Sequence, residues 1–412
     1  MRGLRENGVI ELLGKSKEEL RAWCAGLGEP AYRGAQIYHA LYAERKFDIA
    51  RMTNLPAALR ERLSSEAQIS LPEVKQRFFS ADGSVRYLFG LDTAEGEFNA
   101  EDTKKKKGGE EKKVRGKNED GKSSGAQRVQ RPASVEAVFM PSEGRQTICI
   151  STQAGCAVDC HFCLTAQLGL IRNLSPGEIL GQVLVALQDA GKGAADSRKD
   201  SDARGEVGLA PQTNIVLMGQ GEPLLNFEPV MAALRILLDP EGMGISPKHV
   251  TLSTSGIVPG IARLAQEKVR PKLAISLNAS NDEQREKLMP INKKYPLAAL
   301  IDACRNYPLR PWEHLTFEYV MLGGLNDSPE DARRVVKLLA SLKSVKVNLI
   351  PWNPGELPYR ESSQEQIEEF RKILVDRGVP AFVRYSRGRD VMAACGQLAL
   401  LQIESSQPQV HG

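Results

Sequence analysis

Short β-branched runs alternate with helical stretches of about 10 to 15 residues from Thr147 to Tyr385. This alternation favours βα units on a parallel sheet, because consecutive parallel strands need a crossover between them. Six such units precede a final strand, so the sequence predicts an α/β fold with a partial (β/α)6 barrel over residues 147–386. Active-site residues of such barrels gather at the carboxyl ends of strands. The predicted strands are Ile148–Ser151, Asn214–Met218, Val250–Ser253, Leu273–Leu277, Leu315–Met321, Val345–Ile350 and Ala381–Tyr385.

Three of the seven cysteines, Cys156, Cys160 and Cys163, follow the first predicted strand in the spacing Cys-x3-Cys-x2-Cys. Three thiolates fit a 4Fe-4S cluster that keeps one iron open, since the cluster takes four ligands. A zinc site would need a fourth close ligand, and His161 would compete for space rather than supply it. The other alternative is a helical stripe of buried thiols. The motif resembles that of the radical S-adenosylmethionine (SAM) superfamily, in which SAM chelates the open iron.

Polar residues follow several predicted strands at the edge where the cysteine loop begins. Taken singly, a Gly-rich turn such as 219–223 is usually only a turn, and Ser255 is by default a helix cap. At successive strand ends after an iron–sulfur loop, these residues resemble a SAM pocket. Glu222 would receive the SAM ammonium group, while Ser253 and Asn353 would bond its carboxylate or ribose. The predicted SAM-binding residues are Gly221, Glu222, Ser253, Ser276, Leu277, Asn278 and Asn353.

The first 146 residues have a different pattern. A capping box at Ser16 and Glu19 begins the first of three predicted helices, so residues 1–70 are expected to form a mostly helical accessory domain. Residues 71–146 are predicted to be a β-rich connector with a hairpin at 75–89 and a strand at 135–140.

Two polar insertions interrupt the pattern. Residues 101–131 contain eight lysines and three arginines against six acidic residues, a net charge of +5 within a chain of net charge +4. This segment is expected to be a disordered loop, either without function or a basic tether for RNA phosphates. Residues 191–211 are predicted to be a plain surface loop.

The bulk composition limits where the chain works. With 42% hydrophobic and 26% charged residues it is typical of a globular protein, and no apolar run approaches 18 residues. The N-terminus lacks the apolar core of a signal peptide. An odd number of cysteines, three of them clustered, argues against a secreted disulfide framework. We therefore expect a cytoplasmic protein without a membrane anchor.

Several further motifs coincide with one family. They are the segments 149–163, 218–226, 253–256, 350–354 and 394–398, together with 52–56 in the N-terminal unit. They resemble the RlmN/Cfr family of radical-SAM enzymes, which methylate adenine carbons in RNA, and the likeness covers nearly the whole chain. The resemblance implies methylation of carbon 2 of an adenine in 23S rRNA and of the adenine 3′ of the anticodon in tRNAs. It further implies an RNA-binding accessory domain at 1–70, an electron donor such as flavodoxin or ferredoxin, and a monomer.

The resemblance also implies roles for two outlying cysteines and a glutamate. Cys395, in the C-terminal segment 387–412, would be methylated by one SAM, and a second SAM would supply the radical that activates this methyl group. The resulting carbon radical would add to adenine, and Cys149 would then release the product by attacking the Cys395 sulfur. Glu136 would remove the proton from the adduct; without the resemblance, a lone Glu on a strand would be interpreted as solvent-facing.

The sequence departs from the family pattern at two places, and two rival functions are weighed against the RlmN branch. Asn278 stands where the family often has His, and the insertions at 101–131 and 191–211 are not part of the pattern. The Cfr branch, which methylates adenine carbon 8, is the nearest rival, although the long N-terminal unit and the Gln-Leu after Cys395-Gly favour the RlmN branch. A noncatalytic iron–sulfur RNA-binding protein would not need Cys149 and Cys395.

Cys24 and Cys304 are predicted to be core thiols.

Overall fold

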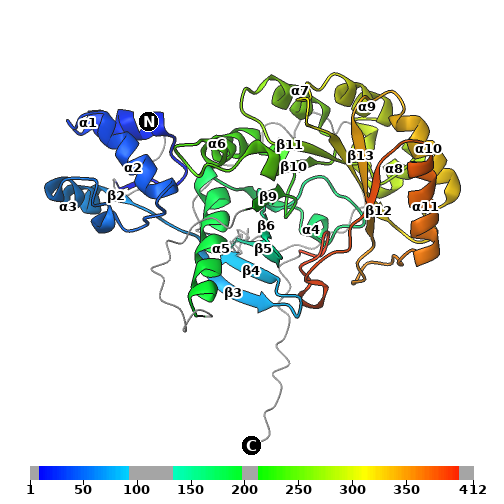
Figure 1. Ribbon diagram of the computed structural model, residues 1–412, viewed down its shortest axis with the longest axis horizontal. Helices are drawn as coiled ribbons and strands as arrows, with labels where there is room; N and C mark the ends of the chain where they lie inside the picture. Colours follow the sequence, from blue (N-terminus) through cyan, green and yellow to red (C-terminus); the bar gives the residue numbers. More distant parts are fainter. Residues whose placement is uncertain (1–8, 92–132, 197–211, 399–412) are drawn as a thin grey trace, which may run out of the picture.

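The computed structural model describes residues 9–91, 133–196 and 212–398, and its first part is a small helical unit. Helices α1 (Lys17–Gly26), α2 (Tyr32–Tyr42) and α3 (Ala57–Glu66) make up this unit. A parallel pair, β1 (Ile10–Glu11) with β2 (Ala67–Gln68), joins its two ends. In Figure 1 the unit lies to one side of the larger domain.

Local chemistry explains the contacts of this unit. Ser16 and Glu19 form the predicted capping box at the start of α1. Gly34 on α2 lies so close to α1 that a Cβ atom there would meet the Arg21 backbone nitrogen at 2.3 Å. The Tyr38 hydroxyl donates to Asp239 Oδ2 of the larger domain at 2.9 Å, so a buried side chain of α2 attaches the unit to that domain.

Ten strands form one sheet in the order β14-β13-β12-β11-β10-β9-β6-β5-β4-β3. The seven strands from β14 to β6 are parallel, and β5, β4 and β3 continue the sheet with antiparallel pairing. The connector strands therefore belong to the same sheet as the barrel. The bounds are β3 (Glu73–Phe79), β4 (Val85–Gly90), β5 (Ser134–Ser142), β6 (Arg145–Cys149), β9 (Thr213–Leu217), β10 (Val250–Thr254), β11 (Lys272–Ser276), β12 (Leu315–Met321), β13 (Val345–Pro351) and β14 (Ala381–Val383).

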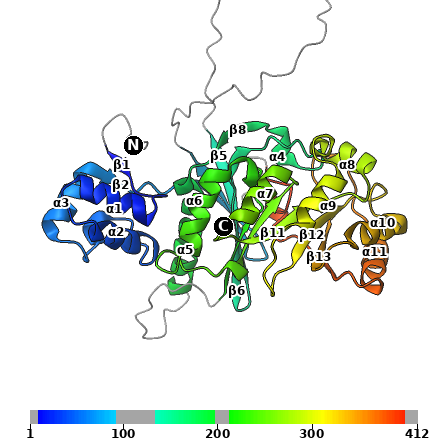
Figure 2. The ribbon, with the colours of Figure 1, turned by 90° about the horizontal axis from the view of Figure 1, so that it is seen from above.

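Helices cover the outer face of the parallel strands (Figures 1 and 2). Alternate residues of each strand, such as Leu273 and Ile275 on β11 or Val347 and Leu349 on β13, are fully buried in the core beneath them. The intervening residues point into the barrel. Capping boxes at Ser328 and Ser363 begin two of these helices. The helices are α5 (Pro176–Asp196), α6 (Phe227–Leu238), α7 (Val258–Gln266), α8 (Asp282–Leu288), α9 (Leu297–Arg305), α10 (Pro329–Leu339) and α11 (Gln364–Asp376).

The structure corrects the sequence prediction at two places. A short hairpin, β7 (Gln153–Gly155) with β8 (Leu170–Asn173), and a one-turn helix, α4 (Leu164–Gln167), flank the cysteine loop and were not predicted. Residues 191–196 continue α5 instead of starting a loop, since neither glycine there breaks the helix. The rest of that insertion and the whole of 101–131 lie outside the described residues.

Other predictions hold. The seven barrel strands are found within a few residues of their predicted bounds, and the hairpin of β3 and β4 and the strand β5 are present. Cys24 and Cys304 are buried core thiols, as predicted. Over the described ranges, no helix has both the length and the apolarity needed to cross a bilayer.

Candidate active site

The three clustered cysteines lie in the loop between β7 and α4, at the carboxyl end of the barrel strands. The Cys156 N–H donates to the Gly169 carbonyl and the Cys163 N–H donates to the Cys160 carbonyl, each at 3.0 Å. Gly155 has φ +73°, and a Cβ atom there would meet the Gly169 carbonyl oxygen at 1.8 Å. Only glycine fits this position. The resulting tight loop places all three thiols on the wall of one cavity.

The chemistry of these thiols fits an iron–sulfur cluster. All three are free, and burial raises the pKa of Cys156 to about 12 and also raises that of Cys160 and Cys163. A positively charged iron centre would hold them as thiolates despite this burial. In the part of the chain that the structure describes, no three His, Cys, Asp or Glu side chains are arranged to hold a single metal ion. Cys156, Cys160 and Cys163 would be the three cluster ligands.

Glu222 is the buried carboxylate of this cavity. Its side chain accepts hydrogen bonds from the Leu224 N–H at 3.0 Å, the Ser255 N–H at 2.7 Å and the Ser255 hydroxyl at 2.8 Å. Burial raises the pKa of Glu222, and these donors oppose the shift. Ser255 therefore holds Glu222 and does not cap a helix, which corrects the default interpretation of its position.

The glycine before Glu222 has a steric role. Gly221 has φ +94°, and a Cβ atom there would lie 2.5 Å from the Gln153 Cβ. Gln153 in turn accepts the Glu222 N–H at 2.8 Å. The turn 219–222 thus packs directly on β7, which leads into the cysteine loop.

Of the other predicted SAM-binding residues, three line this cavity, whereas Leu277 and Asn353 do not. Ser253, Ser276 and Asn278 line the cavity with Gly221 and Glu222. Asn278 has φ +56°, a region that Asn tolerates, and its Oδ1 accepts the Val320 N–H at 2.9 Å. Leu277 is fully buried in the core, because it occupies the outer face of its strand.

Asn353 does not line either of the two cavities next to the cysteines. Its Nδ2 donates to the Ser386 hydroxyl at 2.9 Å and to the Cys395 carbonyl at 3.4 Å. In this structure Asn353 therefore supports the loop that carries Cys395.

Cys149 and Cys395 both line a second, larger cavity of about 670 Å³, and Cys395 lines the first cavity as well. Cys149 is the last residue of β6 and is buried. Burial raises the pKa of its thiol, and the nearby Cys395 raises it further. Cys395 is exposed as a whole residue, but desolvation of its thiol and the nearby Glu318 raise the pKa of that thiol to about 11. Both cysteines are free thiols. The fold therefore places Cys149, near the start of the barrel sequence, and Cys395, after its end, on the wall of the same cavity.

Hydrogen bonds fix the C-terminal segment that carries Cys395. The Leu164 N–H donates to the Gly396 carbonyl at 2.8 Å, and the Thr165 hydroxyl donates to the Leu398 carbonyl at 2.5 Å. Gly396 has φ +80°, which glycine adopts without strain. Cys395 is thus attached to α4, the helix that follows the cluster cysteines.

Glu136 is buried in an ion pair. It lies on β5, two residues from Val138, which pairs with Cys149. Its Oε1 is 2.6 Å from Arg86 Nη1, and both side chains are almost fully inaccessible to solvent. Gln220 contacts it twice: the Glu136 N–H donates to Gln220 Oε1 at 3.1 Å, and Gln220 Nε2 donates to the carboxylate at 3.4 Å. Glu136 is therefore not solvent-facing, and it does not line either of the two cavities.

Sequence reasoning missed Arg86 and Gln220. Arg86 lies among apolar residues of β4, where period-2 patterning predicts one polar face but does not show that this face is buried. Gln220 lies within a glycine-rich turn, and its contact with a strand 84 positions earlier has no local signal.

A cysteine loop at the carboxyl edge of a parallel half-barrel, beside a buried carboxylate, defines a radical-SAM protein. The family model of the Radical SAM superfamily matches residues 150–339, and that of the ribosomal RNA large subunit methyltransferase N-terminal domain matches residues 10–69. The predicted partial barrel with its helical N-terminal unit is confirmed.

The particular family follows from whole-chain relatives. The probable dual-specificity RNA methyltransferase RlmN of Koribacter versatilis (strain Ellin345) is 47% identical over 374 residues, which cover 90% of this chain and 96% of that protein. The dual-specificity RNA methyltransferase RlmN of Anaeromyxobacter dehalogenans (strain 2CP-C) is 42% identical, with coverage of 93% and 90%. The crystal structure of a radical SAM methyltransferase from Sphaerobacter thermophilus matches with a TM-score of 0.76 and 38% identity, covering 94% of this chain and 98% of the other. The chain belongs to the RlmN family.

Proposed function

We propose that this chain is a radical-SAM methyltransferase that methylates carbon 2 of an adenine in 23S rRNA and of the adenine 3′ of the anticodon in tRNAs. The observation that carries the proposal is the convergence of Cys149 and Cys395 on one cavity beside the cluster cysteines. The dual-specificity RNA methyltransferases that resemble the chain over nearly its whole length support the same reaction.

The chemistry explains why two extra cysteines are needed. Carbon 2 of adenine is electrophilic, so it cannot attack the SAM methyl group as a nucleophile. A cluster held by Cys156, Cys160 and Cys163 would, with SAM bound, supply a carbon-centred radical. Cys395 holds the methyl carbon that is joined to adenine. Once the adduct has returned its unpaired electron to the cluster and given its ring proton to Glu136, Cys149 attacks the Cys395 sulfur: the S–S bond forms, the C–S bond breaks, and the released carbon takes up a proton to give the methylated base.

Glu136 takes the remaining proton in this scheme. The Arg86 guanidinium at 2.6 Å stabilises a negative charge on its carboxylate, which is the form that accepts a proton. Glu136 lies on the strand next to Cys149, on the same face of the sheet as the Val138 side chain that packs on that cysteine.

The proposal includes several further components. Each turnover uses two SAM molecules, one as the methyl source and one as the radical source. A low-potential donor such as flavodoxin or ferredoxin supplies the electron, and the chain acts as a monomer. Residues 1–70 form the accessory domain that contacts RNA, while Glu222, Ser253, Ser276 and Asn278 hold SAM.

The relay predicts different outcomes for the two cysteines. Cys149→Ala should accumulate protein crosslinked to RNA through Cys395, because the adduct forms but nothing expels the sulfur. Cys395→Ala and the double variant should form no adduct. Cys24→Ala, which changes a core thiol of the N-terminal unit, is the control and should turn over without a stable adduct.

The measurement is a denaturing gel of each reduced, cluster-loaded variant with 23S rRNA fragments and tRNA, followed by nuclease digestion and peptide mapping. Normal turnover by Cys149→Ala without a crosslink would refute the relay. Mass spectrometry of the digested wild-type product distinguishes the Cfr-type alternative, since 8-methyladenosine in place of 2-methyladenosine would contradict the assignment of carbon 2.

A further inference from the structure

The larger cavity extends from the two relay cysteines toward the amino ends of the barrel strands. Its walls combine Cys149 and Cys395 with inward-pointing residues of six parallel strands. Among the described residues that line it, five carry a lysine or arginine side chain, one is a histidine, and Glu318 is the single carboxylate. The basic residues are Arg145, His249, Lys272, Lys346, Arg384 and Arg387.

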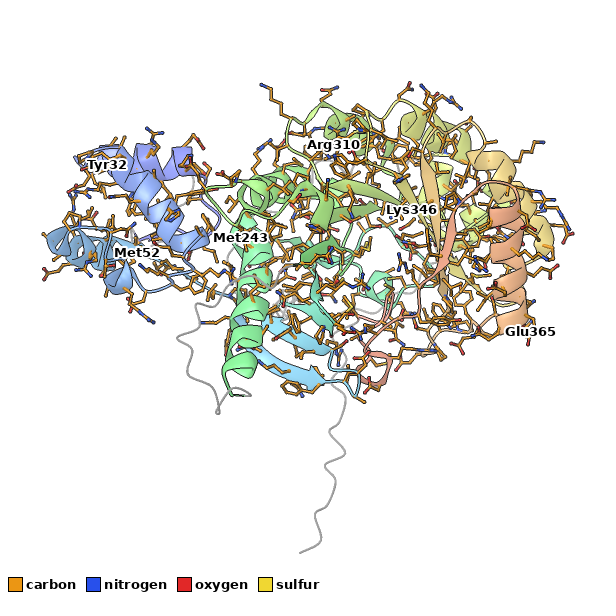
Figure 3. All side chains as sticks on the ribbon, in the orientation of Figure 1. Tyr32, Met52, Met243, Arg310, Lys346 and Glu365 are labelled. Carbon is orange, nitrogen blue, oxygen red and sulfur yellow. The ribbon has the colours of Figure 1, made fainter. Side chains whose placement is uncertain are left out.

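These basic side chains lie at a defined depth. Lys272 is four residues before Ser276 on β11, and Lys346 is four residues before Ile350 on β13; Ser276 and Ile350 both line the cysteine cavity. Four residues of strand span about 13 Å. The two lysines therefore lie deeper in the barrel than the residues that line the cysteine cavity. Lys346 is labelled in Figure 3, near the middle of the barrel domain and far from Tyr32 and Met52 of the N-terminal unit.

Lys272 and Lys346 make no hydrogen bond or ion pair through their ammonium groups in the described part of the chain. Of the carboxylates that attract them, Glu313 pairs with Arg270 and Arg310, and Glu318 accepts from Asn348. Burial and repulsion by Lys346 lower the pKa of Lys272, and the Glu313 carboxylate partly opposes this shift. Burial and repulsion by Arg384 lower the pKa of Lys346, and Glu318 partly opposes it. Two partly buried cations that repel each other destabilise the free protein, and an anion bound between them would offset this cost.

The neighbouring polar groups are already engaged. His249 Nδ1 is 3.0 Å from Asn214 Oδ1, Arg384 Nε donates to Asn348 Oδ1 at 3.3 Å, and Arg387 donates to the Pro141 carbonyl. Asn348 also donates to Glu318 Oε1 at 2.9 Å. These bonds hold the wall in place. Among the described basic residues that line the cavity, the side chains of Lys272, Lys346 and the exposed Arg145 are those without a hydrogen bond or ion pair.

We propose that Lys272 and Lys346 bind a backbone phosphate of the RNA strand that carries the target adenine. The inference rests on the proposed function and adds to it a phosphate subsite inside the barrel. An adenine turned out of its stack must bring its own sugar and phosphates with it. The base would lie at the level of Cys149 and Cys395, and a phosphate next to the target nucleoside would lie between the lysines.

The test combines charge removal in the protein with charge removal in the RNA. Lys272→Met, Lys346→Met and the double variant remove the cations and keep much of the side-chain length, while Lys346→Arg keeps the charge. Lys372→Met, on the outer helix α11 whose start is marked by Glu365 in Figure 3, is the matched control at an exposed lysine. The substrates are an RNA hairpin and two versions with a neutral methylphosphonate on one or the other side of the target adenosine.

The readouts are the dissociation constant of each hairpin, measured by fluorescence anisotropy over a range of salt concentrations, and the KM for RNA. The double variant should weaken binding at least about tenfold, as expected for a lost charge-assisted contact. Its salt slope should fall by about 0.7 for the phosphate no longer neutralised on a single strand. One of the two methylphosphonates should weaken wild-type binding by a similar factor and should not weaken the double variant further. Lys346→Arg and Lys372→Met should behave as wild type.

Two results would overturn the subsite. The first is that the double variant and the methylphosphonate weaken RNA binding additively. The second is that neither methylphosphonate changes the dissociation constant of the wild type. The second result needs no variant, so it holds even where a substitution impairs folding. Failure of the proposed function gives a different result: the wild type would bind the hairpins but form no methyladenosine. The binding of the lysine variants to the methylphosphonate hairpins would still decide the phosphate subsite.

Discussion

The buried pair of Arg86 and Glu136 allows a quantitative prediction about stability. Arg86→Met removes the guanidinium but keeps an apolar stem over the Phe78 ring, on which Arg86 now lies at 4.0 Å. The side chains are 0% and 1% exposed, so the Glu136 charge that remains would have no access to water. Breaking a buried pair in this way typically destabilises a protein by about 3–5 kcal/mol, because one charge is left uncompensated. We expect the free energy of unfolding to fall by this amount.

A double variant that also removes the Glu136 charge tests whether the loss of stability comes from the unpaired charge. Arg86→Met combined with Glu136→Met removes both charges and should recover most of the loss, since apolar replacements of a buried pair are often neutral. Arg371→Met, which breaks the exposed pair with Glu368 on α11, is the control and should leave the unfolding midpoint nearly unchanged. Urea unfolding followed by circular dichroism under anaerobic conditions measures all four proteins. A single variant that loses less than about 1 kcal/mol, or a double variant no more stable than the single, would refute the reasoning.

Three other predictions concern the site. Cys156→Ala, Cys160→Ala or Cys163→Ala should each abolish the iron–sulfur absorbance and the cleavage of SAM to 5′-deoxyadenosine; a full cluster in any of them would contradict the ligand assignment. Gly155→Ala should lower cluster yield and stability, by about 1–3 kcal/mol from backbone strain alone, because it places a Cβ against the Gly169 carbonyl; unchanged iron content and melting temperature would argue against this. Burial raises the pKa of Glu318 above its ordinary 4.5, so the folded state binds this proton more tightly and loses stability as the pH rises above 4.5. Glu318→Gln should therefore gain in unfolding free energy relative to the wild type between pH 4.5 and 7, and parallel pH curves would refute the shift.

The sequence by itself determined the barrel and the chemistry of its cysteine loop. Strand periodicity and helical crossovers are local signals, so β6 and β9–β14 could be predicted within a few residues, and Cys156, Cys160 and Cys163 are close enough in sequence to show ligand spacing. The same local signals did not extend to β7, β8 and α4, which are too short to show a period.

Only the tertiary structure decided which distant residues meet. Period-2 alternation separates Lys346 from Val347 but does not say which face is the core and which is the interior of a barrel, since that depends on how the whole sheet curves. The pairing of Arg86 with Glu136 and the approach of Cys395 to Cys149 come from strand register and from the hydrogen bonds that attach the C-terminal segment to α4. Each of these two contacts joins residues far apart in sequence, so it forms only in the folded chain and has no local sequence signal.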